Sequence, residues 1–229
     1  MKAIVAVAMI WGEAWAQQCA VPGDVPRTRP TRVDYRNEVP TDYYALALSW
    51  SPQFCNSPAG QGERNRWQCE ENAFGFVVHG LWPQSAKAKN YDEHPRNCRA
   101  PEMLPRELVR KYLCVMPSAQ LMQDEWVKHG TCAWGEAKAY FERVEGLYRG
   151  LRLPELEGGV TTAGAIRKRI VIANAGSGMK PEHVQVRVVS GNRFSEVFVC
   201  YDKQFRYGAC LTPGTPDGIE VRVAGRRKR

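Results

Sequence analysis

Eight cysteines constrain the fold of this 229-residue chain more than any other feature of its sequence. They are Cys19, Cys55, Cys69, Cys98, Cys114, Cys132, Cys200 and Cys210. An even number of scattered cysteines in an exported chain indicates four disulfides. Zinc is the competing interpretation, because His129 and Cys132 have a ligand-like spacing, but no CxxC motif occurs. We therefore predict four disulfides and no metal. The spacing leaves the pairing open, with Cys200–Cys210 and Cys55–Cys69 as the nearest candidates.

Residues 1–16 have the pattern of a secretory signal peptide. Lys2 supplies a positive start, residues 3–11 an apolar stretch, and Ala14-Trp15-Ala16 a cleavage site before Gln17. A buried N-terminal helix is the alternative interpretation. Every cysteine follows the proposed cleavage site, so we expect a periplasmic or extracellular protein. No apolar run approaches the ~20 residues that a membrane span needs, and we expect no membrane segment.

The chain is basic, with a formal net charge of +8 and a pI near 9.1. A basic exported protein suits a polyanionic partner such as nucleic acid. Part of the excess comes from residues 226–229, which we predict to be a basic tail. Residues 17–225 are then expected to form a single domain.

Hydrophobic periodicity predicts strands at both ends of this domain and helices between them. The expected strands are residues 43–50, 74–78, 184–189, 196–201 and 207–211, and the expected helices are residues 102–116, 119–129, 137–151 and 163–173. Ser118 is expected to cap the second helix, and Thr161 or Thr162 the last. The order favours an α+β fold with a central, mainly antiparallel sheet flanked by helices and cross-linked by disulfides.

Two segments contain histidines in unusual surroundings, FVVHGLWP around His79 and EWVKHGTC around His129. His79 is expected at the end of the strand 74–78. Residues three and four apart share a helix face, so Glu125 should lie beside Lys128 and His129. Taken alone, the helical triplet is typical of a solvated face with an ion pair. Together the two segments favour acid–base chemistry on a phosphodiester.

The same segments resemble the two signature motifs of the ribonuclease T2 family. HGLWP (79–83) and EWVKHGTC (125–132) carry the resemblance, which extends to ALALSWSPQFC (45–55) and FVCYDK (198–203). The resemblance implies a secreted endoribonuclease of the ribonuclease T2-type fold that cleaves single-stranded RNA. It implies no cofactor, no obligate protein partner and a monomer.

The implied reaction uses the 2′-hydroxyl of RNA as nucleophile and forms a 2′,3′-cyclic phosphate. By resemblance His129 is the base, His79 the acid, and Lys128 with Glu125 stabilise the transition state. Many relatives have a further histidine before the glutamate, where this chain has Asp124. The main alternative is a catalytically silent relative that binds RNA.

Aromatic residues near the two motifs have two competing interpretations. Trp82 and Trp126 are expected to pack against the histidines and fix their orientation. Trp50, Phe54 and Trp82 are the candidates for stacking on an RNA base. The other histidines, His94 and His183, lie in polar contexts and receive no role.

Overall fold

A six-stranded sheet forms the centre of the molecule. The computed structural model describes residues 19–72 and 74–226, so the proposed signal peptide lies outside the described residues. The strands are β1 (Tyr43–Trp50), β2 (Phe76–Gln84), β3 (Gly159–Thr162), β4 (Val184–Val189), β5 (Arg193–Tyr201) and β6 (Glu220–Val223). They are ordered β2-β1-β5-β6-β3, and β4 also pairs with β5. Every pairing is antiparallel except β5 with β6, which confirms the predicted α+β class.

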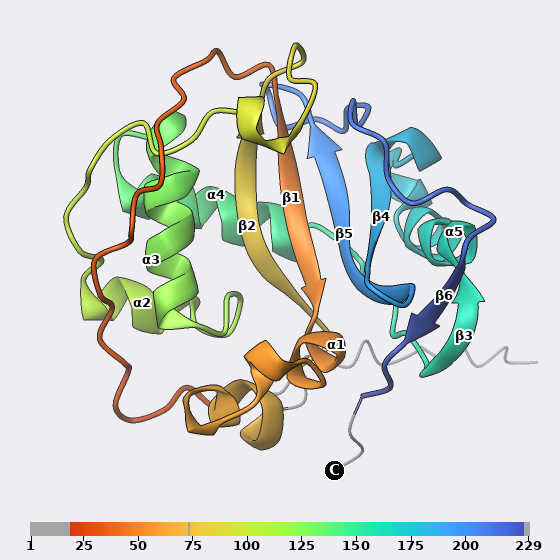
Figure 1. Ribbon diagram of the computed structural model, residues 1–229, viewed down its shortest axis with the longest axis horizontal. Coiled ribbons are helices and arrows are strands. Elements are labelled where there is room, and N and C mark those ends of the chain that lie inside the picture. Colours follow the sequence, from red (N-terminus) through yellow and green to blue (C-terminus); the bar gives the residue numbers. More distant parts are fainter. Residues whose placement is uncertain (1–18, 73, 227–229) are drawn as a thin grey trace, which may run out of the picture.

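Within residues 19–72 and 74–226, five α-helices connect the strands. They are α1 (Ser51–Cys55), α2 (Arg106–Tyr112), α3 (Ala119–Lys128), α4 (Ala137–Arg149) and α5 (Ala163–Ala173). The hydroxyls of Ser118 and Thr162 cap α3 and α5, as predicted, by accepting from backbone N–H groups. Figure 1 shows α3 alongside β2, α4 passing behind β2 and β1, and α5 against β4. Among the described residues, no helix has the length and apolar character to cross a membrane.

The two faces of the sheet are buried differently. One face packs on the helices and forms the main core, in which Leu46, Val78 and Val197 meet Tyr140 and other helix side chains. The opposite face carries a smaller apolar cluster, made of Tyr43, Ala45, Ala47, Trp82, Phe198 and Cys200. This alternation along β1 and β5 leaves the second face free to carry polar side chains beyond the small cluster.

β2 continues through His79, so the prediction that a strand ends at Val78 was wrong. Ala47 pairs with Gly80 and Leu48 with Val78, which makes His79 the extra residue of a β-bulge. A bulge bends the strand and redirects a side chain without ending the ladder. β2 is an edge strand, where a proline such as Pro83 is tolerated because its missing N–H faces no neighbour.

Three other predictions needed correction. The helix expected over 102–116 is shorter, Arg106–Tyr112, because Pro105 starts it and a turn follows. The strand expected over 207–211 is reduced to an isolated bridge between Tyr201 and Tyr207. Strands β3 and β6 were missed, because each is only four residues long; β3 is mostly exposed, and β6 buries only Val221 and Val223.

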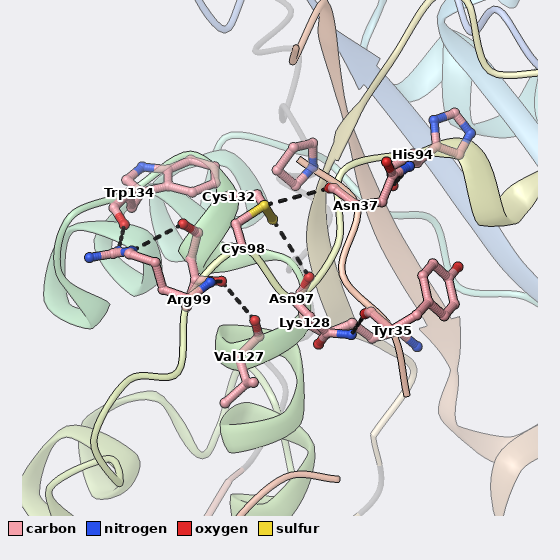
Figure 2. Close-up of a disulfide and its surroundings, with 12 residues drawn as sticks. Tyr35, Asn37, His94, Asn97, Cys98, Arg99, Val127, Lys128, Cys132 and Trp134 are labelled. Carbon is pink, nitrogen blue, oxygen red and sulfur yellow. Dashed lines mark hydrogen bonds between the residues drawn. A yellow bond between two sulfur atoms is a disulfide. The ribbon is translucent and has the colours of Figure 1, made fainter. Parts of the chain in front are cut away.

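The eight cysteines form four disulfides, as predicted. The two pairs that are nearest in sequence, Cys55–Cys69 and Cys200–Cys210, are both bonded. The others, Cys19–Cys114 and Cys98–Cys132, join segments 95 and 34 residues apart. Figure 2 shows Cys98–Cys132, which links the loop before α2 to the turn that follows α3. This cross-link fixes the end of the helix that carries the second histidine segment.

We predict that the long-range disulfide stabilises the protein more than the local one. In the chain-entropy model, loss of Cys19–Cys114 costs about 4.7 kcal/mol and loss of Cys200–Cys210 about 2.7 kcal/mol. Urea unfolding of the two double Cys→Ser variants measures both free energies. Equal losses would contradict a mainly entropic stabilisation by these cross-links.

Candidate active site

The two predicted histidine segments meet where the bulge of β2 faces the C-terminal end of α3. His79 comes from the bulge, Glu125 from the last turn of α3, and His129 from the residue that ends this helix. Segments 50 residues apart in sequence thus form one cluster. Glu125 and His129 lie on one face of the helix end, as expected, with Oε2 of Glu125 4.0 Å from Nε2 of His129.

The carboxylate of Glu125 lies at the centre of this cluster. One oxygen lies 3.6 Å from Nε2 of His79, and the other accepts a hydrogen bond of 2.6 Å from the Trp82 indole N–H. Glu125 is only 4% exposed. Burial raises its pKa, and the His79 imidazole and the Trp82 N–H act in the opposite direction. Trp82 therefore holds the carboxylate in place.

Gly80 makes this contact possible. A Cβ atom at position 80 would lie 2.1 Å from Oε2 of Glu125 and 2.5 Å from Nε1 of Trp82. Any larger residue would displace one of these groups. The glycine of the HGLWP motif is thus required by packing against the carboxylate.

His129 is held as a neutral imidazole. It is 4% exposed, and its ring stacks on Trp82 with the centroids 5.2 Å apart. Neither ring nitrogen has a hydrogen-bond partner among the described residues. Burial, and then the Lys128 ammonium and His79, lower its pKa well below the ordinary value of 6.5. The ring therefore retains a basic nitrogen at neutral pH.

His79 has the opposite electrostatic surroundings. Its Nδ1 lies 2.6 Å from Oε1 of Glu196, a residue of β5, and its side chain is 32% exposed. Burial opposes the charged form, but the carboxylates of Glu125 and Glu196 outweigh this effect and raise the pKa of His79 to about 9. The imidazole is therefore a cation at neutral pH.

Lys128 is fixed through its backbone. Its carbonyl oxygen accepts a 2.8 Å hydrogen bond from the N–H of Asn97, and the side-chain amide of Asn97 donates to the Tyr35 carbonyl. Figure 2 shows these residues beside the Cys98–Cys132 disulfide. The end of α3 is thus attached to two other segments. The positive charge of the Lys128 ammonium lowers the pKa values of His79, Glu125 and His129.

Asp124 does not take part in this cluster. Its carboxylate accepts hydrogen bonds from the Thr31 hydroxyl at 2.7 Å and from the Gln120 amide at 2.9 Å. The residue that replaces the further histidine of many relatives therefore anchors the segment before β1.

The three aromatic candidates differ in their surroundings. Trp50 is 1% exposed in the core and donates to the Ala224 carbonyl, so it has no face free for a base and the prediction was wrong. Trp82 is 4% exposed between the two imidazoles, which is the expected packing role. Phe54 is half-buried in α1 and has no contact with the histidine cluster among those that the structure records. Trp126 packs on Tyr140 in the main core.

Four further residues adjoin the cluster and were missed from the sequence. They are Ser49, Glu196, Arg187 and Tyr91. The first three form a row across the sheet, because Ser49 and Arg187 are both cross-strand partners of Glu196. A charged residue within an apolar strand run is the one sequence signal for Arg187 of β4 and Glu196 of β5, and no such signal marks Ser49 or Tyr91. Tyr91 is 46% exposed and its ring contacts Trp82 edge-on.

The other two histidines have structural roles. His94 accepts a hydrogen bond from the backbone N–H of Ser85, and His183 accepts one from the backbone N–H of Lys180.

The Ribonuclease T2 family model matches residues 41–208, a range that contains both histidine segments. The chain belongs to the ribonuclease T2 family. A probable ribonuclease of Haemophilus influenzae is 35% identical over 80% of this chain, and ribonuclease I of Escherichia coli is 32% identical over 44%. The matched regions span 65% and 50% of these two relatives, respectively.

Solved structures support the ribonuclease T2 fold. Trichomaglin, an S-like ribonuclease, superposes with a TM-score of 0.63 at 18% identity and covers 82% of this chain and 98% of its own. RNase NT in complex with 5′-AMP superposes with a TM-score of 0.62 at 21% identity. The match covers 82% of this chain and 100% of RNase NT. At these identities the likeness establishes the fold alone.

We predict that Gly80→Ala destabilises the protein by about 1–3 kcal/mol, because the added methyl group overpacks the Glu125–Trp82 contact. Gly146→Ala in α4 is the control, since a Cβ atom at position 146 would meet nothing within 4 Å and alanine favours a helix. Denaturant unfolding compares them. Equal stability of the two variants would contradict the packing role of Gly80.

Proposed function

We propose that the protein is an exported, metal-independent endoribonuclease that cleaves single-stranded RNA through a 2′,3′-cyclic phosphate. Membership of the ribonuclease T2 family and the ribonuclease names of its relatives support this activity. One observation carries the mechanism: two imidazoles with opposite protonation preferences flank one buried carboxylate. Acid–base catalysis of this reaction requires one neutral and one protonated group.

In the first step His129 removes the proton of the 2′-hydroxyl. The 2′-oxygen bonds to phosphorus, and the bond from phosphorus to the 5′-oxygen breaks. His79, protonated in the free protein, gives its Nε2 proton to the departing 5′-oxygen. In the second step a water molecule opens the cyclic phosphate, and the two imidazoles exchange roles.

Lys128 and Glu125 stabilise the charge that develops on the phosphorane. The Lys128 ammonium supplies fixed positive charge beside both imidazoles. Burial raises the pKa of Glu125, and an incoming phosphate would raise it further. In its protonated form Glu125 can donate a hydrogen bond to a phosphoryl oxygen. Arg187, whose guanidinium lies over the Phe198 ring on the same sheet face, adds positive charge along the path of the RNA backbone.

The exposed ring of Tyr91 is the best platform for a base. It lies against Trp82 at the edge of the cluster, and unstacked RNA bases bind aromatic faces of this kind. Export is supported by the four disulfides, which persist in oxidising compartments.

We predict that the oxidised protein cleaves single-stranded RNA in the presence of EDTA and leaves 2′,3′-cyclic ends. His129→Ala should reduce kcat by about 100-fold or more, the usual contribution of a general base. The exposed Lys168→Ala is the control, with activity unchanged. Binding without cleavage between pH 4 and 8 would instead support the catalytically silent relative.

The two pKa shifts predict a broad pH optimum. The base works deprotonated, so kcat/KM should fall only when the pH drops through the low pKa of His129. The acid works protonated, so kcat/KM should fall when the pH rises through about 9. A pH–rate profile with a decline centred near 6.5 on its alkaline side would contradict this assignment of acid and base.

Tyr91→Ala is predicted to raise KM for a dinucleotide by roughly fivefold to 150-fold, since stacking on one base contributes about 1–3 kcal/mol. Tyr91→Phe keeps the ring and should leave KM unchanged. If both variants behave like the unmodified protein, the base binds elsewhere.

A further inference from the structure

Glu196 forms the shortest contact that either histidine of the cluster makes in the described structure. Its Oε1 lies 2.6 Å from Nδ1 of His79, although the two residues are 117 positions apart in sequence. β1 lies between their strands, and the bulge of β2 turns His79 toward this face of the sheet. The contact therefore depends on the bulge and on the register of three strands.

The carboxylate of Glu196 is itself held in place. Ser49 of β1, its cross-strand partner, donates a hydrogen bond of 2.7 Å to the same oxygen that contacts His79. The Glu196 side chain is 16% exposed. Burial acts against its ionisation, but the hydrogen bonds from His79 and Ser49, with the charge of Arg187, lower the pKa of Glu196. It remains an anion while it faces the imidazole.

We propose that Glu196 is a positioning residue that fixes the ring of His79 and keeps its Nε2 proton directed at the leaving oxygen. This inference rests on the proposed ribonuclease function. Because Nδ1–H is bound to Glu196, the ring is prevented from rotating about its χ2 angle, and Nε2 is the nitrogen left for the substrate.

The charges around His79 show why one carboxylate would not be enough. Glu125 attracts the imidazolium from α3, but Glu125 also faces the phosphate and is expected to be protonated when RNA binds. Glu196 would then be the remaining anion beside the acid. In the described structure, the titratable and charged groups that face His79 or its two carboxylates come from five places. They are Glu125 and Lys128 on α3 with His129 at its end, Tyr140 on α4, Arg187 on β4, Glu196 on β5 and Tyr91 in the loop after β2.

The test is Glu196→Gln, which keeps the size of the side chain and removes its charge. We expect kcat/KM to fall by about threefold or more at pH 8.5 and by less than about 1.5-fold at pH 6, because loss of the charge moves the alkaline decline down from about 9 by a pH unit or more. Glu196→Asp should restore part of the alkaline activity. Glu220→Gln, an exposed change on β6, is the matched control and should follow the unmodified profile.

NMR titration of the His79 ring separates this proposal from the proposed function. In Glu196→Gln the midpoint of His79 should move down by about one pH unit or more, whether or not the protein cleaves RNA. An unchanged midpoint and an unchanged alkaline decline would overturn the positioning role. Absence of cleavage by the unmodified protein, with a shifted His79 midpoint, would overturn the ribonuclease proposal and leave the pairing of His79 with Glu196 in place.

Discussion

Glu125 is buried between two imidazoles and an indole, and burying a carboxylate there destabilises the protein unless its neighbours compensate. Trp82 donates to it, His79 offers positive charge, and Gly80 leaves room for it. The other parts of the site follow from this arrangement. The bulge is needed to bring His79 to the carboxylate, and the indole that holds Glu125 also forms the surface on which His129 stacks.

The asymmetry between the histidines comes from the sheet. Both imidazoles are close to Glu125, yet among the described residues only His79 has a second carboxylate, because β5 places Glu196 next to it. His129 lies at the end of α3, where burial and Lys128 act against its charged form. His129 is thus positioned by the end of a helix, and His79 by the pairing of strands. The Cys98–Cys132 disulfide and the hydrogen bond from the Asn97 N–H to the Lys128 carbonyl hold the end of α3 in place.

Local patterns predicted much of the fold and part of the site. β1, β4 and α5 were predicted with their observed bounds, since β1 is a continuous apolar run ended by Ser51-Pro52, β4 alternates in strand fashion, and a threonine cap opens α5. The bulge at His79 could not be predicted, because it depends on the register between β1 and β2. Glu196 and Ser49 were missed for the same reason: cross-strand contacts join residues that nothing in the local sequence connects. Trp50 was misassigned because an aromatic residue at a strand end has the same pattern whether it faces core or solvent.

The free protein holds the His79 imidazole charged and the His129 imidazole neutral, and the assignment of acid and base depends on this difference. ¹⁵N NMR of the histidine rings at pH 7, with His79 and His129 assigned by single substitutions, measures this directly. Nitrogen shifts of a cationic ring for His79 and of a neutral ring for His129 are the predicted result. Two neutral rings at pH 7, or a charged His129, would contradict the account.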